Sequence, residues 1–274
     1  MPTVALALAL CAALVHASWN TLVARSRDPG LATAIAAALS VTLPLPLVVA
    51  TWRASAAVAG PAIVSAGFEL AYLVLLGSAY GRAQLSVIYP LARGLAPVLV
   101  LLAAVAISGA TGSPLAAFGV LLVAVGVVAV RGIHGTAGGL DVVLALAISA
   151  CIAGYTTIDK IGVTRAAPIT YYELAMVAPS LLYVAWLGRR RGIRAVRAAL
   201  GPSTVVAGLG MFGAYALVLA ALTMASAADV SATRETSVVI ATIMGGLFLS
   251  EPVGPRRLLG AVAVAAGIVA LALS

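Results

Sequence analysis

Five ionisable side chains stand inside long apolar stretches of this sequence. They are Glu69, Arg93, Glu173, Arg234 and Glu235. If those stretches cross a bilayer, a charge at its centre costs about 2.5 to 3.5 kcal/mol on insertion scales, so each charge needs a partner or a wet cavity. One interpretation is structural ion pairing, for example Glu69 with Arg93. Glu173 with Arg234 would form the second such pair. The other interpretation is that some of these residues line a cavity and hold a charged substrate.

Helical spacing gives several of these charges an aromatic neighbour. Residues three or four positions apart share one face of a helix. Three such pairs occur: Glu69 with Tyr72, Tyr89 with Arg93, and Tyr155 with Asp159. A tyrosine beside a charge offers a hydrogen bond and an aromatic wall to an amphipathic ligand. Pro90 and Pro97 flank Arg93, and prolines that remove backbone donors predict a bend that exposes carbonyls to a polar hollow.

The segment HASWN, residues 16 to 20, carries a second group of polar residues. His16 and Asn20 share one helical face, and Trp19 lies between them in angle. Trp19 is either an interfacial anchor, with His16 as a packing residue, or part of a binding site. In the second case His16 binds substrate or couples protons, because its charge changes near neutral pH. At the corresponding place in the second half of the chain, Asp159 and Lys160 either pair at the membrane edge or Asp159 points inward.

The composition sets the class of protein. The chain has 274 residues, of which 63% are hydrophobic and only 9% charged, whereas about a quarter are charged in soluble domains. We therefore expect an integral membrane protein. In a membrane protein, a net charge of +8 reflects basic residues that set the orientation in the membrane and contact anionic lipids. We therefore expect no nucleic-acid partner.

Runs of apolar residues predict an all-α protein with ten transmembrane helices. A helix needs about 20 apolar residues to cross roughly 30 Å of hydrocarbon. We place the spans at residues 3–24, 31–52, 62–81, 84–108, 114–131, 139–160, 168–188, 202–223, 228–249 and 256–273. The first run begins almost at Met1 without a basic leader, so we interpret it as a retained helix and not as a cleaved signal peptide.

An internal comparison predicts two repeats of opposite orientation. One offset superposes Arg93 on Arg234, and the same offset superposes Pro114, Gly119 and Gly126 on Pro255, Gly260 and Gly267. The predicted repeats cover residues 1–134 and 139–274. Each holds five helices, and an odd number inverts the second repeat, which is the architecture of many secondary transporters.

Loop charges indicate an orientation for ten spans. The odd-numbered loops carry Arg25, Arg27, Arg82, Arg131, Arg189, Arg190, Arg191, Arg194, Arg197, Arg256 and Arg257. The even-numbered loops carry only Arg53, Lys160 and Arg165. Taken alone, this bias places the odd loops in the cytoplasm and both termini outside.

Motifs of soluble enzymes are missing from the sequence. It contains no HExxH, no GxSxG and no Gly-rich phosphate loop, so hydrolase and nucleotide-binding chemistry are not indicated. The two cysteines, Cys11 and Cys151, form no CxxC metal motif. We expect no enzymatic activity, no cofactor and no metal site.

Several long stretches carry a resemblance to a known family. HASWN, GRAQLSVIYPLARGLAPVLVLL, GYTTIDKIG and SATRETSVVIATIMGGLFLSEPVGPRRLLGAVAVAAGIVAL resemble the EamA family of the drug/metabolite transporter superfamily. Within it they are similar to a branch of phosphonate-utilisation-associated membrane proteins. The chain departs from the usual family pattern in having SEP where GER is common, and Ala110 where the first repeat would carry an acid.

The resemblance implies a fold, a site and an orientation. The fold is a basket-shaped bundle whose central cavity is lined by the first, third, fourth, sixth, eighth and ninth spans. The branch pattern marks His16, Trp19, Asn20, Tyr89, Pro90, Arg93, Asp159, Arg234 and Glu235. Similar proteins have both termini in the cytoplasm, opposite to the loop charges, so the orientation stays open.

Together these observations predict a multi-pass inner-membrane secondary transporter for a small polar metabolite, anionic or zwitterionic. Arg93 and Arg234 would clamp the anionic group, and one acid would carry a coupling proton. The predicted substrate-binding residues are His16, Trp19, Asn20, Glu69, Tyr72, Tyr89, Arg93, Tyr155, Asp159, Glu173, Arg234 and Glu235. The partners would be a small-molecule substrate and membrane lipids. The alternatives are a flippase for lipid-linked substrates and, less favoured, an intramembrane enzyme or receptor.

Overall fold

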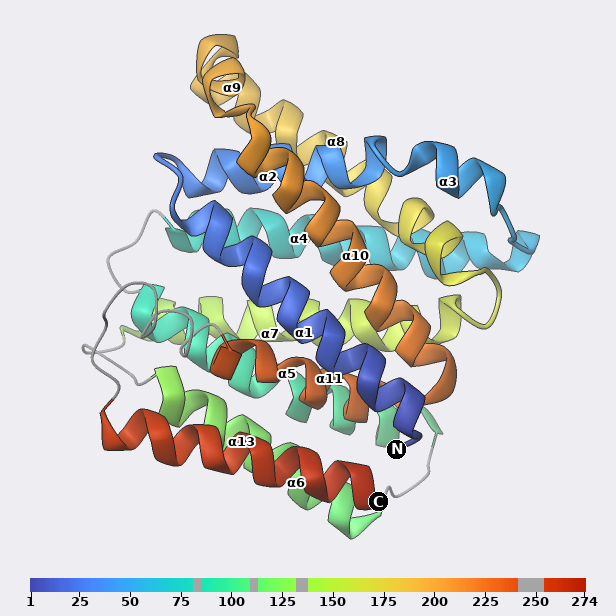
Figure 1. Ribbon diagram of the computed structural model, residues 1–274, viewed down its shortest axis with the longest axis vertical. Coiled ribbons are helices and arrows are strands. Elements are labelled where there is room, and N and C mark those ends of the chain that lie inside the picture. Colours follow the sequence, from blue (N-terminus) through green and yellow to red (C-terminus); the bar gives the residue numbers. More distant parts are fainter. Residues whose placement is uncertain (81–84, 109–112, 132–137, 241–253) are drawn as a thin grey trace.

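The fold is a bundle of helices, seen in a computed structural model that describes residues 1–80, 85–108, 113–131, 138–240 and 254–274 (Figure 1). The first half holds α1 (Thr3–Ala24), α2 (Pro29–Thr42), α3 (Leu45–Ala50), the short 3-10 helix η1 (Ala56–Val58), α4 (Ala59–Tyr80), α5 (Leu85–Ser108) and α6 (Pro114–Arg131). The second half holds α7 (Gly139–Gly162), α8 (Pro168–Arg191), α9 (Ile193–Ala199), α10 (Pro202–Met224), α11 (Ala227–Arg234) and α13 (Pro255–Leu273).

The helices fall on the predicted spans. Among the described residues, five helical stretches are long and apolar enough to cross a membrane: Thr3–Ala24, Pro29–Ala50, Ala56–Leu76, Gly139–Gly162 and Pro202–Met224. Shorter apolar stretches lie in α5, α6 and α13. The second span is divided into α2 and α3 next to Pro44, because proline cannot donate the next helical hydrogen bond. The ninth span corresponds to α11 and the helical residues 236–240.

The packing of the helices repeats itself between the two halves. Helices α1 and α2 of the first half both pack on α10. Their counterparts in the second half, α7 and α8, both pack on α4, the counterpart of α10. Likewise α11 contacts α1 as α5 contacts α7, while α2 with α8 and α6 with α13 form pairs of equivalent helices (Figure 1). This pattern is the one expected for two related five-helix repeats around a pseudo-twofold axis. The repeat limits at residues 134 and 139 stay a prediction.

Glycines allow α6 and α13 to cross closely. A Cβ on Gly119 would lie 2.9 Å from the carbonyl oxygen of Gly267, and a Cβ on Gly126 would lie 2.8 Å from that of Gly260. From one contact to the next, the residue number increases along α6 and decreases along α13, so these two helices run antiparallel. The offset between the halves superposes Gly119 on Gly260 and Gly126 on Gly267. The two glycine contacts are therefore equivalent to each other. Antiparallel packing of equivalent helices is what an inverted repeat requires.

Adding one methyl group at this crossing is expected to destabilise the fold. We expect Gly126→Ala to lower the free energy of unfolding by roughly 1–3 kcal/mol, because the new Cβ overlaps backbone that cannot rotate away. Gly213→Ala in α10 is the matched control, since a Cβ there meets nothing within 4 Å. Chemical unfolding of both variants in detergent measures the difference. Equal stability of the two variants would contradict the close crossing.

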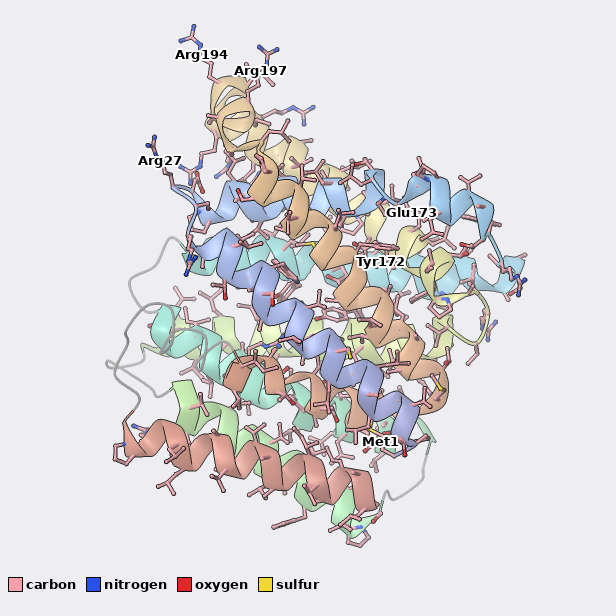
Figure 2. The ribbon with its side chains drawn as sticks, in the orientation of Figure 1. Met1, Arg27, Tyr172, Glu173, Arg194 and Arg197 are labelled. Carbon is pink, nitrogen blue, oxygen red and sulfur yellow. The ribbon has the colours of Figure 1, made fainter. Side chains whose placement is uncertain are left out.

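Polar loops gather at the two ends of the bundle. At one end, Asp28 after α1 forms an ion pair with Arg191 at the end of α8, with 3.3 Å between Oδ2 and Nε. Figure 2 shows Arg27, Arg194 and Arg197 at this same end. At the other end, the loop around Ser55 pairs with the loop around Arg165 through a 2.9 Å backbone hydrogen bond. The first and seventh loops therefore share one end, as the alternation of spans predicts.

Candidate functional site

A cavity lies in the interior of the bundle, where both halves of the chain meet. It holds about 830 Å³ of space not filled by atoms, counting the part that opens at its mouth. Side chains from α1, α2, α4, α5, α7, α8, α10 and α11 line it. Many of the predicted site residues are in this lining: His16, Trp19, Asn20, Glu69, Tyr72, Arg93, Tyr155 and Arg234. Thr33 and Met176 also line the cavity, so the second and seventh spans contribute to it in addition to the spans that the resemblance implied.

Helix α1 presents its polar segment to the cavity. The rings of His16 and Trp19 meet edge to face with centroids 5.0 Å apart, and Asn20 donates from Nδ2 to the His16 carbonyl at 2.9 Å. Trp19 is only 8% exposed and packs with Met211 in a buried cluster. The interpretation of Trp19 as an interfacial anchor is therefore wrong. Its Nε1 has no hydrogen-bond partner among the described residues, so one N–H donor at the cavity wall is unused.

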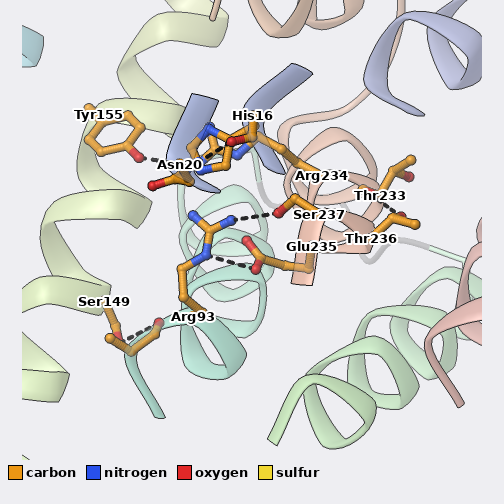
Figure 3. Close-up of polar contacts among 11 residues, drawn as sticks. His16, Asn20, Arg93, Ser149, Tyr155, Thr233, Arg234, Glu235, Thr236 and Ser237 are labelled. Carbon is orange, nitrogen blue, oxygen red and sulfur yellow. Dashed lines mark hydrogen bonds and ion pairs between the residues drawn. The ribbon is translucent and has the colours of Figure 1, made fainter. Parts of the chain in front are cut away.

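Arg93 is held in an ion pair that joins the two halves of the chain. Its Nε lies 2.9 Å from Oε2 of Glu235, and the two side chains are 3% and 1% exposed. Its Nη2 donates to the Ser237 hydroxyl at 3.3 Å (Figure 3). The hypothesis that Glu69 is the ion-pair partner of Arg93 has to be corrected, since Glu235 takes that place. Glu235 does not line the cavity and acts on it through Arg93.

Arg234 occupies the equivalent position in the second half but has a different environment. Its Nη2 donates to the Tyr155 hydroxyl at 3.2 Å. Its Nε has no hydrogen-bond partner within the described part of the chain, although the residue is only 7% exposed. The two arginines that were predicted to clamp a ligand symmetrically are thus unequal: Arg93 is neutralised by a carboxylate, and Arg234 has donor capacity to spare.

Asp159 lies behind the residues that line the cavity and accepts hydrogen bonds from three hydroxyl groups. Its Oδ1 accepts from Ser65 at 2.6 Å and from Tyr171 at 3.1 Å, and its Oδ2 accepts from Tyr215. Tyr215 itself lines the cavity. Asp159 therefore points inward and joins α4, α7, α8 and α10 around one carboxylate.

Lys160, the next residue, points to a different neighbour. Its Nζ donates to the carbonyls of Leu222 at 2.6 Å and Ala225 at 2.9 Å, at the C-terminal end of α10. A cation is favourable there because the last carbonyls of a helix lack partners within the helix. Of the two alternatives for Asp159 and Lys160, pairing at the membrane edge is excluded.

Glu69 adds an acid to the cavity lining that also holds the two arginines. It is 5% exposed on α4, one turn from Ser65, and it lies within electrostatic range of Asp159 and Arg234. Tyr72 follows on the same face and also lines the cavity, as its spacing predicted. The cavity lining consequently holds both acidic and basic side chains.

Aromatic rings contact one another in and directly behind the cavity lining. Tyr155 meets Tyr72 at a centroid distance of 6.1 Å and Tyr215 at 6.2 Å. Tyr172 meets Tyr215 at 5.4 Å from α8. Tyr215 was not predicted, because it lies in the apolar stretch GMFGAYALVLAAL with no charged residue at helical spacing. No sequence signal could have selected it.

Four predicted site residues are not among the lining residues that the structure describes: Asp159, Glu173, Glu235 and Tyr89. Glu173 lies beside Tyr172 on α8 (Figure 2) but is not in the lining, and its Oε2 has no partner among residues that the structure describes. Its hypothetical ion pair with Arg234 is not present. The side chain of Tyr89 falls outside the described residues, as do Ala110 and Glu251.

Metal binding finds no support in the parts of the chain that are described, where no group of three or more His, Cys, Asp or Glu residues could hold an ion. The lining offers groups for reversible binding: a guanidinium and an indole N–H for an anionic group, a carboxylate and tyrosine rings for a cationic or polar group.

A central cavity lined by polar and aromatic groups, inside a bundle of long apolar helices, is the arrangement expected of a multi-pass membrane protein. Residues 140–273 match the model of the EamA-like transporter family, so the second half of the chain is similar to that family. A solved structure titled only "Crystal structure of protein" is 17% identical, with 98% of each chain covered and a TM-score of 0.74. At that identity the likeness concerns the fold alone. A search of curated proteins gave no match.

Proposed function

We propose that the protein is a secondary transporter that moves a small anionic or zwitterionic metabolite across a bacterial inner membrane by alternating access. The match of residues 140–273 to the EamA-like transporter family supports transport. A cavity enclosed by helices of both halves supports a site between two repeats that rock against each other. The similarity to the phosphonate-associated branch makes phosphonates one class to test.

The unused donors of the cavity carry the argument for an anionic group. Arg234 Nε and Trp19 Nε1 both lack partners among the described residues, and both residues line the cavity. A buried donor without an acceptor costs about 1–3 kcal/mol, and more when it is charged. A carboxylate, phosphate or phosphonate would satisfy both donors, and the planar guanidinium suits such groups because its donors form a fork.

The substrate would change the equilibrium between inward-open and outward-open forms through contacts with both repeats. A ligand shifts a conformational equilibrium only if it interacts differently with the two forms. Asn20 and Glu69 come from the first half, while Tyr155 and Arg234 come from the second. A ligand in contact with both sets would stabilise an occluded form in which the halves approach each other.

The proposal is tested by the melting temperature of the purified protein in detergent with a panel of amino acids, phosphonates, phosphorylated sugars, nucleobases and cationic drugs. A ligand that binds only the folded protein raises the midpoint as its concentration rises. We expect at least one anionic or zwitterionic compound to do so, and Arg234→Gln to weaken its binding by a factor of about 30 or more, as for other buried charge pairs.

Arg194→Gln is the matched control, because Arg194 is an exposed arginine on α9 far from the cavity (Figure 2). It should bind the same compound with unchanged affinity. Stabilisation by cationic drugs alone, or equal binding by both variants, would overturn the assignment of an anionic substrate group to Arg234.

A further inference from the structure

The buried charges around the cavity do not balance. Arg93 and Glu235 neutralise each other in a 2.9 Å ion pair. This leaves Arg234 as the remaining guanidinium of the lining, facing two acids, Glu69 and Asp159. With both acids ionised, this set carries one excess negative charge. Buried charge without compensation is costly inside a membrane protein, so the excess is a feature that substrate binding can act on.

Asp159 is the acid that stays ionised. The hydroxyls of Ser65, Tyr171 and Tyr215 all donate to its two oxygens. Hydrogen bonds donated to a carboxylate favour its charged form, and these three donors occupy three of the about four lone-pair sites of Asp159. The residue is also 1% exposed and does not line the cavity, so neither ligand nor solvent in the cavity reaches it directly.

Glu69 is the acid whose charge can vary. It lines the cavity, makes no ion pair within the described part of the chain, and lies within range of Arg234. An anion bound at Arg234 would occupy the only guanidinium of the described lining that has no carboxylate of its own. The charged and titratable groups that face Glu69 are His16 on α1, Arg93 on α5, Cys151, Tyr155 and Asp159 on α7, Tyr171 and Tyr172 on α8, Tyr215 on α10, and Arg234 on α11.

We propose that Glu69 and the substrate anion compete for the positive charge of Arg234, so that Glu69 takes up one proton from solvent when the anion binds. The inference rests on the proposed function and adds its coupling ion. A monoanion brings one negative charge, and the proton that forms an O–H bond on the Glu69 carboxylate removes one. The charge of the site is unchanged, and the substrate and the proton cross the membrane in the same direction.

Binding linkage makes the coupling measurable without a transport assay. If anion binding favours protonation of Glu69, protonation favours anion binding by the same factor. The probe is methanesulfonate, a tetrahedral oxyanion whose charge stays at minus one throughout the titration. While Glu69 is ionised in the empty protein, uptake of one proton per bound anion predicts that the affinity rises about tenfold for each unit by which the pH falls.

The variants separate Glu69 from other acids and from His16. Glu69→Gln, which mimics the protonated acid, should bind methanesulfonate with an affinity independent of pH. Glu173→Gln is the control: it changes a buried glutamate outside the cavity lining and should keep the tenfold slope. His16→Gln should keep it as well. A slope that survives in Glu69→Gln, or that disappears only in His16→Gln, would overturn the proposal.

A second measurement on the unmodified protein does not depend on the folding of any variant. In weakly buffered solution with a pH indicator, methanesulfonate should cause the uptake of one proton for each anion bound, at a pH where the empty site is deprotonated. Binding without proton uptake and without a pH slope would refute the coupling and leave the proposed function intact. Absence of binding at every pH would refute the coupling and the monoanion site at Arg234, while the panel of compounds still tests the proposed function.

Discussion

Arg93→Gln is expected to lower the free energy of unfolding by about 3–5 kcal/mol, because it leaves Glu235 as a buried charge without its ion-pair partner. Glu235 is 0% exposed, and its Oε2 lies 2.9 Å from Arg93 Nε across the boundary between the two halves. The cost is that of desolvating a carboxylate, not the loss of packing, since glutamine fills much of the same space. Chemical unfolding of the purified variant in detergent measures it.

The double variant with Glu235→Gln identifies the cause. Replacing both partners by neutral residues is often nearly neutral, so the second change should restore a large part of the stability lost with the first. Arg234→Gln should be less destabilising than Arg93→Gln, because Arg234 forms no ion pair in the part of the chain that the structure describes. If Arg93→Gln is stable but no longer binds ligand, Arg93 is a substrate ligand, and the asymmetric assignment fails.

The asymmetry between the two arginines originates in the residues that follow them. Arg234 is followed by Glu235, whereas Arg93 is followed by Gly94. A Cβ at Gly94 would lie 2.8 Å from Val128 Cγ2 and 3.1 Å from the Ala124 carbonyl oxygen. A glutamate at that position would therefore collide with α6. The carboxylate that neutralises the arginine of the first half therefore comes from Glu235 in the second half.

This ion pair between the two halves shows why the sequence located the buried charges but not their partners. Hydropathy places the spans, and spacing places residues on one face of their own helix, as for Glu69 with Tyr72 and His16 with Asn20. Neither fixes how one helix is rotated against another. Pairing Arg93 with Glu69 satisfied charge neutrality equally well, and only the packing of α11 against α5 selects Glu235.

The same limit applies to the polar groups behind the cavity. Asp159 and Lys160 are adjacent in sequence but point to different helices, and spacing alone leaves their directions open. Tyr215 could not be predicted because its partner, Asp159, is 56 positions away. By contrast, the sequence shows the glycines of α6 and α13, because they recur at one offset in the two halves. Equivalent helices that meet at the symmetry axis contact each other through such repeated positions.

Asp159→Ala is expected to destabilise the protein by about 3 kcal/mol or more. The change leaves the hydroxyls of Ser65, Tyr171 and Tyr215 without their shared acceptor. Each buried hydroxyl without an acceptor costs about 1–3 kcal/mol. The three single variants, Ser65→Ala, Tyr171→Phe and Tyr215→Phe, remove one donor each and should cost about 1 kcal/mol apiece. Chemical unfolding in detergent compares all four.

The single variants also separate stability from ligand binding. Tyr171→Phe and Tyr215→Phe remove the same atom from the same carboxylate, but only Tyr215 lines the cavity. Ligand affinity should therefore fall in Tyr215→Phe and stay unchanged in Tyr171→Phe at equal loss of stability. If both variants bind ligand equally, Asp159 serves only to hold α4, α7, α8 and α10 together. If only Tyr215→Phe weakens binding, the buried carboxylate also positions one wall of the cavity, and its effect reaches the ligand through a single hydroxyl.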